Sequence, residues 1–317
     1  MTRAQLLTAL ARRLNKAETL DTATKNRLVE FLNETQREVL SHPGLQRLRD
    51  DVLTFASVAN QTAYALPWVA KLTRLYEATN DRTLCGMSLA EYRALAPDPT
   101  SLTGTPSHWV WLGYQFVAKQ PSDASSLFVD STSASDTGTA YLEGETSGGY
   151  PRAVQVTMTG TTAVNLSTAV SDWVRVTKFY LGTAAVGTVT LHEDASGGTE
   201  LARIGIGQTS QRYTAFLLYP TPADAITYSV DATLGITDMA QDNDEPRLPA
   251  DFHDLLVAGA MVREYEKTDD GRLQTSMQRY QQRLRDLLFW MHESGSGSSM
   301  TRSGMGSRLG PWYPAGT

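Results

Sequence analysis

The stretch "GTPSHWVWLGYQFVAKQP" (residues 104–121) and the stretch "DEPRLPADFHDLLVAGAMVREYEK" (residues 244–267) enclose a long segment of different character. The first stretch indicates two strands around a turn at Gly113, because aromatic and aliphatic residues alternate along it. The second indicates a helix, and Pro249 suits its first turn. Thr, Ser, Gly and Val dominate the segment between them. We therefore expect one domain that is interrupted by an inserted domain of another class.

Helical patterns occupy both ends of the chain. One apolar helical face lies within residues 2–15, and a second helix is expected between Asp21 and Pro43, a cap residue and a helix breaker. Near the C-terminus, apolar residues recur at heptad-like spacing: Leu273, Met277, Tyr280, Leu284, Leu287 and Met291. This stripe is too short for a free coiled coil, so it predicts packing against the other long helices.

The middle segment is typical of a β-sandwich. Short alternating runs such as "AVQVTMTG" (153–160) and "RYTAFLLYP" (212–220) are separated by turns rich in Gly and Ser. The predicted fold class is α+β. Residues 1–121 and 228–293 form a discontinuous α-helical bundle domain, residues 122–227 form an inserted all-β sandwich, and residues 294–317 form an extended C-terminal arm.

Bulk properties narrow the function classes. The chain has 317 residues and a formal net charge of -6, which disfavours broad binding to nucleic acid phosphates. Cys85 is the single cysteine, so no disulfide can form within the chain. We find no apolar run of the ~20 residues that a membrane span needs, and no signal-peptide cleavage pattern at the N-terminus. We expect a soluble protein made in a cytoplasm.

A catalytic or metal-binding motif is not evident. No two of the five histidines stand at metal-ligand spacing, and the common nucleotide, serine-hydrolase and zinc motifs are missing. The acidic stretch "DMAQDNDE" (238–245) lacks the Gly and the distal Glu of a calcium loop, which favours a polar linker. "HED" (192–194) is most simply a solvated turn. The sequence predicts no enzyme, no cofactor and no metal.

Two alternatives stay open at this point. Carboxylate pairs for glycoside hydrolysis depend on geometry rather than spacing, and the β segment holds Glu143, Glu145 and Glu193. Their simpler role is to solubilise the outer faces of sheets.

Trp173 is either the central tryptophan of the sandwich or part of a sugar-binding face, and large aromatic residues more often fill small β cores. A carbohydrate- or receptor-binding module is therefore the alternative function, and a cell-wall hydrolase is a third.

The C-terminal segment from Ser294 cannot form a core alone. It carries Arg302 and Arg308 and no acidic side chain, and it ends in Leu309, Trp312 and Tyr313. A basic arm with aromatic residues at its tip suits ordering by a partner, whereas a disordered tail is the plainer alternative.

Four motifs occur in one order along the flanking segments: "QTAYALP" (61–67), "SLAEYRAL" (88–95), "GTPSHWVW" (104–111) and "RLPADFHDLLVAGAMVREYE" (247–266). This ordered set resembles the head-to-tail adaptor, or connector, proteins of tailed bacteriophages, a group related to the tail tubular protein A class. The resemblance covers roughly residues 1–121 and 228–293. The long β segment departs from the compact members of the family.

The resemblance implies a structural virion protein at the portal vertex. Its helices would form a bundle, and its copies a ring, expected to be a dodecamer, that joins the portal protein to tail or nozzle proteins. The C-terminal arm, with Arg302, Arg308, Leu309, Trp312 and Tyr313, would dock on the portal. Genome DNA would pass through the lumen without sequence recognition. The β insertion could contact capsid or fibres.

Overall fold

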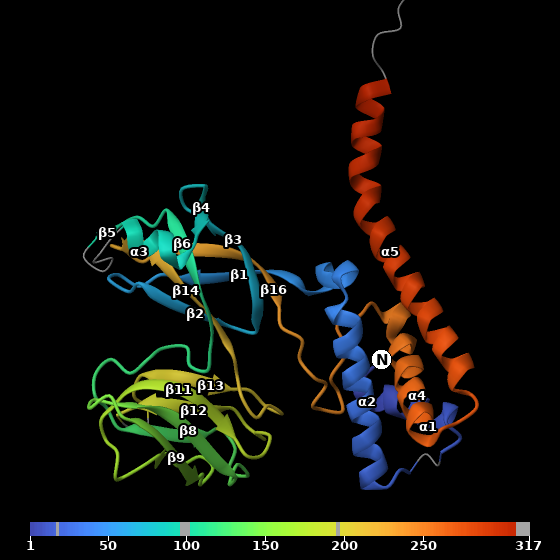
Figure 1. Cartoon of the computed structure of the whole chain (residues 1–317), viewed down its shortest axis with the longest axis horizontal. Coiled ribbons are helices and arrows are strands. Elements are labelled where there is room, and N and C mark those ends of the chain that lie inside the picture. Colours follow the sequence, from blue (N-terminus) through green and yellow to red (C-terminus); the bar gives the residue numbers. More distant parts are fainter. Residues whose placement is uncertain (17–18, 96–101, 195–196, 309–317) are drawn as a thin grey trace, which may run out of the picture. The chain divides into compact units, whose positions relative to one another are not determined.

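The computed structural model describes residues 1–16, 19–95, 102–194 and 197–308, the last fifteen of these by their backbone only. The chain divides into two compact units. One unit joins residues 1–49 to residues 236–317, so the blue and the orange-to-red ends of the chain in Figure 1 belong together. Residues 50–235 form the other unit.

The first unit is helical. Its elements are α1 (Arg3–Arg13), α2 (Thr22–Ser41), the 3-10 helices η1 (Pro43–Arg49) and η2 (Ala250–Phe252), α4 (His253–Thr268) and α5 (Leu273–Arg308). Thr2 and Gln5 form a reciprocal capping box at the start of α1, and Asp21 accepts a hydrogen bond from the Thr24 amide at the start of α2. The α2 helix therefore begins and ends close to the positions that the sequence indicates.

The α4 helix is the centre of this unit, because it packs on α1, α2 and α5. One hydrophobic core runs through all four helices, and most faces of α4 contribute to it. Its fully buried leucines, with no exposed surface, include Leu10 of α1, Leu28 of α2, Leu255 of α4 and Leu287 of α5. A helix that is apolar on most sides is stable only inside such a bundle.

The second unit contains a seven-stranded sheet of order β1-β16-β3-β4-β6-β14-β2. Its strands are β1 (Asp50–Ala56), β2 (Ala63–Pro67), β3 (Val69–Glu77), β4 (Arg82–Met87), β6 (His108–Gln115), β14 (Tyr213–Tyr219) and β16 (Thr227–Leu234). All neighbours pair antiparallel except β4 and β6. The helix α3 (Leu89–Leu95) begins with a capping box formed by Ser88 and Glu91, and β5 (Thr103–Gly104) pairs with β15 (Thr221–Pro222).

Two further sheets lie between β6 and β14 in the chain. The four-stranded sheet contains β10 (Val164–Asn165), β7 (Leu127–Ser131), β12 (Val189–Glu193) and β13 (Glu200–Ile204). The three-stranded sheet contains β11 (Trp173–Leu181), β8 (Thr139–Thr146) and β9 (Pro151–Thr157). Both sheets contribute to one core around Trp173 and Phe179. All these strands fall within the predicted insertion of residues 122–227.

The predicted α+β class is confirmed, and the unit boundaries lie elsewhere than the expected domain boundaries. The sequence analysis assigns residues 1–121 and 228–293 to the helical domain, whereas the compact units divide after Arg49 and after Gly235. The reason is long-range strand pairing, because β1 hydrogen-bonds along β16 and β6 along β14. These contacts tie residues 50–115 to residues 213–234 in one sheet.

The α5 helix continues to Arg308, into the segment that is predicted to be an arm from Ser294 onward. Residues 309–317 lie outside the described residues. No helix in the described ranges is both long enough and apolar enough to cross a membrane.

Candidate functional site

The α5 helix is the most extended element of the helical unit, with 36 residues. Leu273, Tyr280, Leu284, Leu287 and Met291 of the predicted stripe pack against the core of the bundle. Met277 does not follow this pattern, since its side chain is 42% exposed and the neighbouring Ser276 is buried. The bundle therefore holds the first five turns of α5 by one face and leaves its other face accessible.

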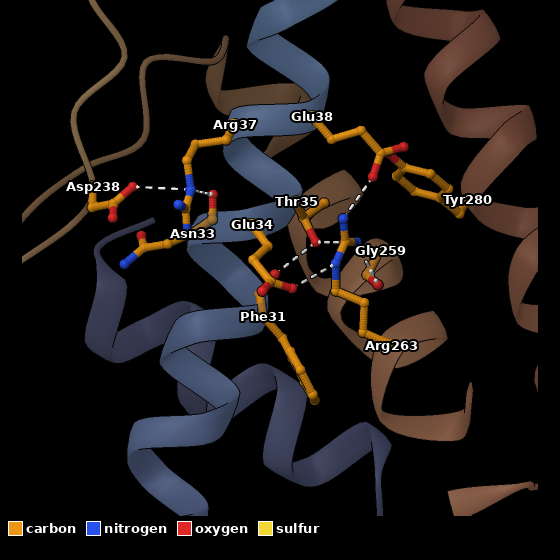
Figure 2. Close-up of polar contacts among 10 residues, drawn as sticks. All are labelled: Phe31, Asn33, Glu34, Thr35, Arg37, Glu38, Asp238, Gly259, Arg263 and Tyr280. Carbon is orange, nitrogen blue, oxygen red and sulfur yellow. Dashed lines mark hydrogen bonds and ion pairs between the residues drawn. The ribbon is translucent and has the colours of Figure 1, made fainter. Parts of the chain in front are cut away.

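A polar network fixes α5 and α2 on α4 (Figure 2). Arg263 of α4 donates to Glu34 Oε2 at 3.1 Å and to Glu38 Oε2 at 2.6 Å, both on α2. The other carboxylate oxygen of Glu38 accepts a hydrogen bond from the Tyr280 hydroxyl of α5 at 2.9 Å. Burial and the nearby Glu38 charge raise the pKa of Tyr280 above its ordinary value, so the phenol stays a donor. Three helices thus share one hydrogen-bond network.

Gly259 lies where these three helices meet, and Figure 2 shows it beside Thr35, Arg263 and Tyr280. A Cβ atom at Gly259 would lie 2.3 Å from Thr35 Cγ2 and 2.9 Å from Tyr280 Cε2. No real Cβ atom comes this close to a neighbour, so the absence of a side chain sets the spacing of α2, α4 and α5.

A second clamp holds α5 at the start of α4. Arg283 donates to both carboxylate oxygens of Asp254, at 2.7 and 3.1 Å. Its guanidinium carbon also lies 5.3 Å from the centre of the Phe252 ring. The Trp290 ring packs on the same phenylalanine at 5.8 Å. Bidentate Arg–carboxylate geometry adds directional specificity to the packing, so the clamp fixes the rotation of α5 as well as its position.

Glu264 supplies a charged contact inside the bundle. It accepts hydrogen bonds from Arg27 of α2 at 3.1 and 3.2 Å and lies 2.9 Å from Lys16 Nζ. Burial disfavours the charged form, but the hydrogen bonds from Arg27 and Lys16 outweigh it, and the pKa of the Glu264 carboxyl is lowered. The ionised form is therefore the one that holds α2 and α4 together.

The acidic stretch 238–245 serves as a polar linker that is fixed to the bundle, as the sequence analysis favours. Asp242 forms an ion pair with Arg3 at 2.6 Å, and Asp238 lies 3.4 Å from Arg37 (Figure 2). The amides at the start of α1 also donate to backbone carbonyls of this linker. Two of its carboxylates, Asp238 and Asp242, form ion pairs with α1 and α2.

The accessible face of α5 carries aromatic residues. Phe289 is 64% exposed, and Trp290, although it contacts Phe252, also keeps an exposed edge. The side chains one turn from Phe289 are the exposed Arg285, Asp286, His292 and Glu293. Single exposed apolar residues are common on protein surfaces, but a large aromatic residue on a helix that is clamped at two places is a suitable anchor for a partner.

The predicted docking residues fall in the least described part of the chain. Arg302 and Arg308 lie on the α5 backbone, with side chains outside the described part. Leu309, Trp312 and Tyr313 lie outside the described residues altogether. The docking role of these five residues stays a prediction. No sequence pattern singled out Phe289 and Trp290, although both belong to the uninterrupted apolar run "LLFWM" (287–291).

The carboxylates of the β segment do not converge on one site. Glu143 pairs with Lys178 at 2.7 Å and Glu145 with Arg175 at 3.5 Å, on the three-stranded sheet. Glu193 belongs to the other sheet and is buried, where burial opposes its ionisation but hydrogen bonds from Ser122 and Ser125 lower its pKa. Each of these three carboxylates has a structural partner.

Trp173 is fully buried in the core that the two smaller sheets share. The core interpretation, which the sequence analysis favours for this residue, therefore holds. A fully buried indole offers no face to a sugar. His192 lies in β12 rather than in a turn, and its imidazole is 3.2 Å from Asp130. Among the described residues, no three His, Cys, Asp or Glu side chains gather as a metal site would require.

Comparison with known protein families gives a match. The family model described as SU10 adaptor protein matches residues 1–129 and 136–305, which is most of the chain. The chain belongs to the SU10 adaptor protein family. This family consists of phage adaptor proteins, so the chain is a structural protein that associates with other proteins of the phage virion. A search of curated proteins finds no match to this SU10 adaptor.

The family assignment also covers most of the β segment. The match is interrupted only between residues 129 and 136, so the strands from β8 to β13 lie inside it. The family-level identification of a phage adaptor therefore agrees with the resemblance that the ordered motifs indicate.

Proposed function

We propose that this SU10 adaptor forms a ring that joins the portal protein to the tail and lines part of the DNA channel. The observation that carries this proposal is the clamped α5 helix with its exposed Phe289. An element that must connect two assemblies needs a rigid base and an accessible surface, not a catalytic pocket. The resemblance to connector proteins related to tail tubular protein A supports the same role.

In this proposal the helical unit is the adaptor body and strands β7 to β13 form an inserted sandwich domain. Copies of the chain meet through two different patches, so the contact is heterologous and closes into a ring, which we expect to contain twelve copies. Genome DNA passes through the lumen, and the net charge of -6 suits a surface that binds phosphate weakly. Tail or nozzle proteins lie on the far side of the ring, and the inserted domain contacts capsid or fibres.

The C-terminal part of α5 and the arm of residues 294–317 dock on the portal, with Arg302, Arg308, Leu309, Trp312 and Tyr313 as contacts. Ordering of such a segment costs conformational entropy, which only a complementary partner offsets. Docking therefore occurs late and only on an assembled portal.

Truncation after Glu293 tests this proposal. All residues of the helical core whose side chains the structure describes lie before this position, so we expect the truncated chain to keep its unfolding temperature. Its helical circular dichroism should fall only by the contribution of the removed turns of α5. Binding to purified portal should fall at least tenfold, measured by co-sedimentation or surface plasmon resonance. A truncated chain that binds the portal as tightly as the full chain would remove the docking role of the arm.

A further inference from the structure

The second unit contains a strained backbone position beside a recess. Trp68 connects β2 to β3 as a single residue, and its φ angle is +65°. A bulky residue in the left-handed region is a genuine outlier, whereas glycine adopts the same angle without steric cost. The Trp68 carbonyl accepts a hydrogen bond from the Gly235 amide, which holds the bend in place.

The Trp68 side chain is not buried in a core to compensate for this strain. It is 38% exposed, and its ring lies beside Gly205, where an added Cβ would be 3.5 Å from Trp68 Cζ2. Backbone strain of this kind costs of order 1–3 kcal/mol and is concentrated at functional sites. The strained backbone at Trp68 therefore leaves part of the indole ring exposed. Packing of the ring alone does not explain the free-energy cost of this strain.

The exposed ring forms one wall of a cavity of about 360 Å³. β13 also lines the cavity, through Arg203 and Glu200, and Arg203 donates to Glu200 at 2.6 and 3.0 Å. Tyr213 forms part of the lining and is fixed by hydrogen bonds of its hydroxyl with the Arg203 backbone, at 2.8 and 3.0 Å. This volume is at the small end of the range for ligand sites in proteins.

Gln211 adds an unused hydrogen-bond acceptor. Its side chain lines the cavity and the residue is only 5% exposed. Its Nε2 donates to the Arg212 carbonyl at 2.7 Å, whereas its Oε1 accepts no hydrogen bond from any residue that the structure describes. The Oε1 atom is not fully buried and stays accessible to solvent in the recess, so a ligand hydroxyl can donate to it in place of water.

We propose that this recess binds one neutral pyranose unit of a saccharide. The apolar face of the sugar ring stacks on the Trp68 indole, and one hydroxyl donates to Gln211 Oε1. Other hydroxyls, which both donate and accept, reach Glu200 and Arg203 at the rim. Glu200 and Arg203 neutralise each other, so the site favours a neutral ligand over a phosphate or a sugar acid. This site is independent of the proposed ring.

The proposal is tested by NMR on the full chain labelled with ¹⁵N, which is titrated with glucose, galactose, mannose and N-acetylglucosamine. Glucose 1-phosphate and a proline-rich peptide serve as comparison ligands. At least one neutral sugar should shift the Trp68 indole signal in a saturable manner. Trp68→Ala and Gln211→Ala should each weaken binding at least tenfold. Trp111→Ala, which removes an exposed tryptophan outside the recess, should leave binding unchanged.

Trp68→Gly separates a binding role from a structural one. Glycine adopts φ of +65° without strain, so this variant should keep or raise the unfolding temperature while binding is lost. If Trp68 serves only the fold, Trp68→Gly will lower the unfolding temperature and no sugar will bind. The absence of saturable shifts with every neutral sugar, or binding of the phosphorylated sugar or the peptide in their place, would overturn the proposal.

Discussion

Gly259 decides how closely three helices approach, because Thr35 and Tyr280 occupy the space that a side chain at this position would need. The sequence places Gly259 within the helix expected in residues 244–267, where it has no distinguishing feature. Only the packed structure shows that α2 and α5 meet above it. Its role could not be predicted from the local pattern, since the two contacting residues come from distant segments.

We expect Gly259→Ala to lower the free energy of unfolding of the helical unit by about 1–3 kcal/mol, the usual cost of overpacking a filled core. Denaturation by urea, followed by circular dichroism, measures this change. Gly271→Ala is the matched control, because a Cβ atom there meets no atom within 4 Å. Equal stability of the two variants would contradict the close approach.

The ion pairs of Glu264 predict how the free energy of unfolding changes with pH. Its pKa is lowered from an ordinary value of 4.5 by Arg27 and Lys16, against the effect of burial. The folded chain therefore binds this proton less tightly than the unfolded chain does. The stabilisation by Glu264 is fully present at a pH above the pKa of the unfolded chain. It is lost as the pH falls through the lower pKa that Glu264 has in the folded chain.

Glu264→Gln should therefore be less stable than the unmodified chain at neutral pH, and the difference should shrink as the pH falls below about 4.5. Urea unfolding at a series of pH values measures it. Glu30→Gln, at an exposed position on α2, is the control. A stability difference that stays constant down to the acid end of the series would show that the ion pairs contribute nothing.

At the scale of elements, the sequence predicts local structure well and long-range pairing poorly. Periodicity identifies the helices and most strands, because it depends on neighbouring residues alone. Partner choice in the seven-stranded sheet depends on contacts such as Asp50 with Thr233, which are 183 positions apart. This is why the compact units divide after Arg49 and Gly235. The recess at Trp68 could not be predicted from the sequence either, because it is lined by residues of β2 and, far from them in the chain, by residues of β13 and β14.

The two faces of α5 should respond differently to substitution. Leu287 has no exposed surface, whereas Phe289, two positions later, is mostly exposed. Leu287→Ala should lower the free energy of unfolding by about 2–5 kcal/mol, because it opens a cavity. Phe289→Ser should leave stability within about 0.5 kcal/mol but weaken binding to the portal. Unchanged portal binding by a folded Phe289→Ser variant would exclude this residue from the docking surface.

At the scale of the whole molecule, the two compact units share no hydrophobic core: the helical unit has one, and residues 50–235 contain two, one in the seven-stranded sheet and one between the two smaller sheets. We therefore expect two separable unfolding transitions in calorimetry. Gly259→Val should shift only the transition of the helical unit. Trp173→Ala, which removes a fully buried side chain at a cost of about 3–5 kcal/mol, should shift only the other one. A single transition that both variants shift equally would mean that the units unfold as one.

The central claim concerns the place of this adaptor in the virion, and imaging of the portal vertex at subnanometre resolution tests it most directly. We predict a closed ring of this chain between the portal and the tail, with the C-terminal part of α5 against the portal. A virion whose vertex contains no such ring, or in which this chain is found at another position, would contradict the account.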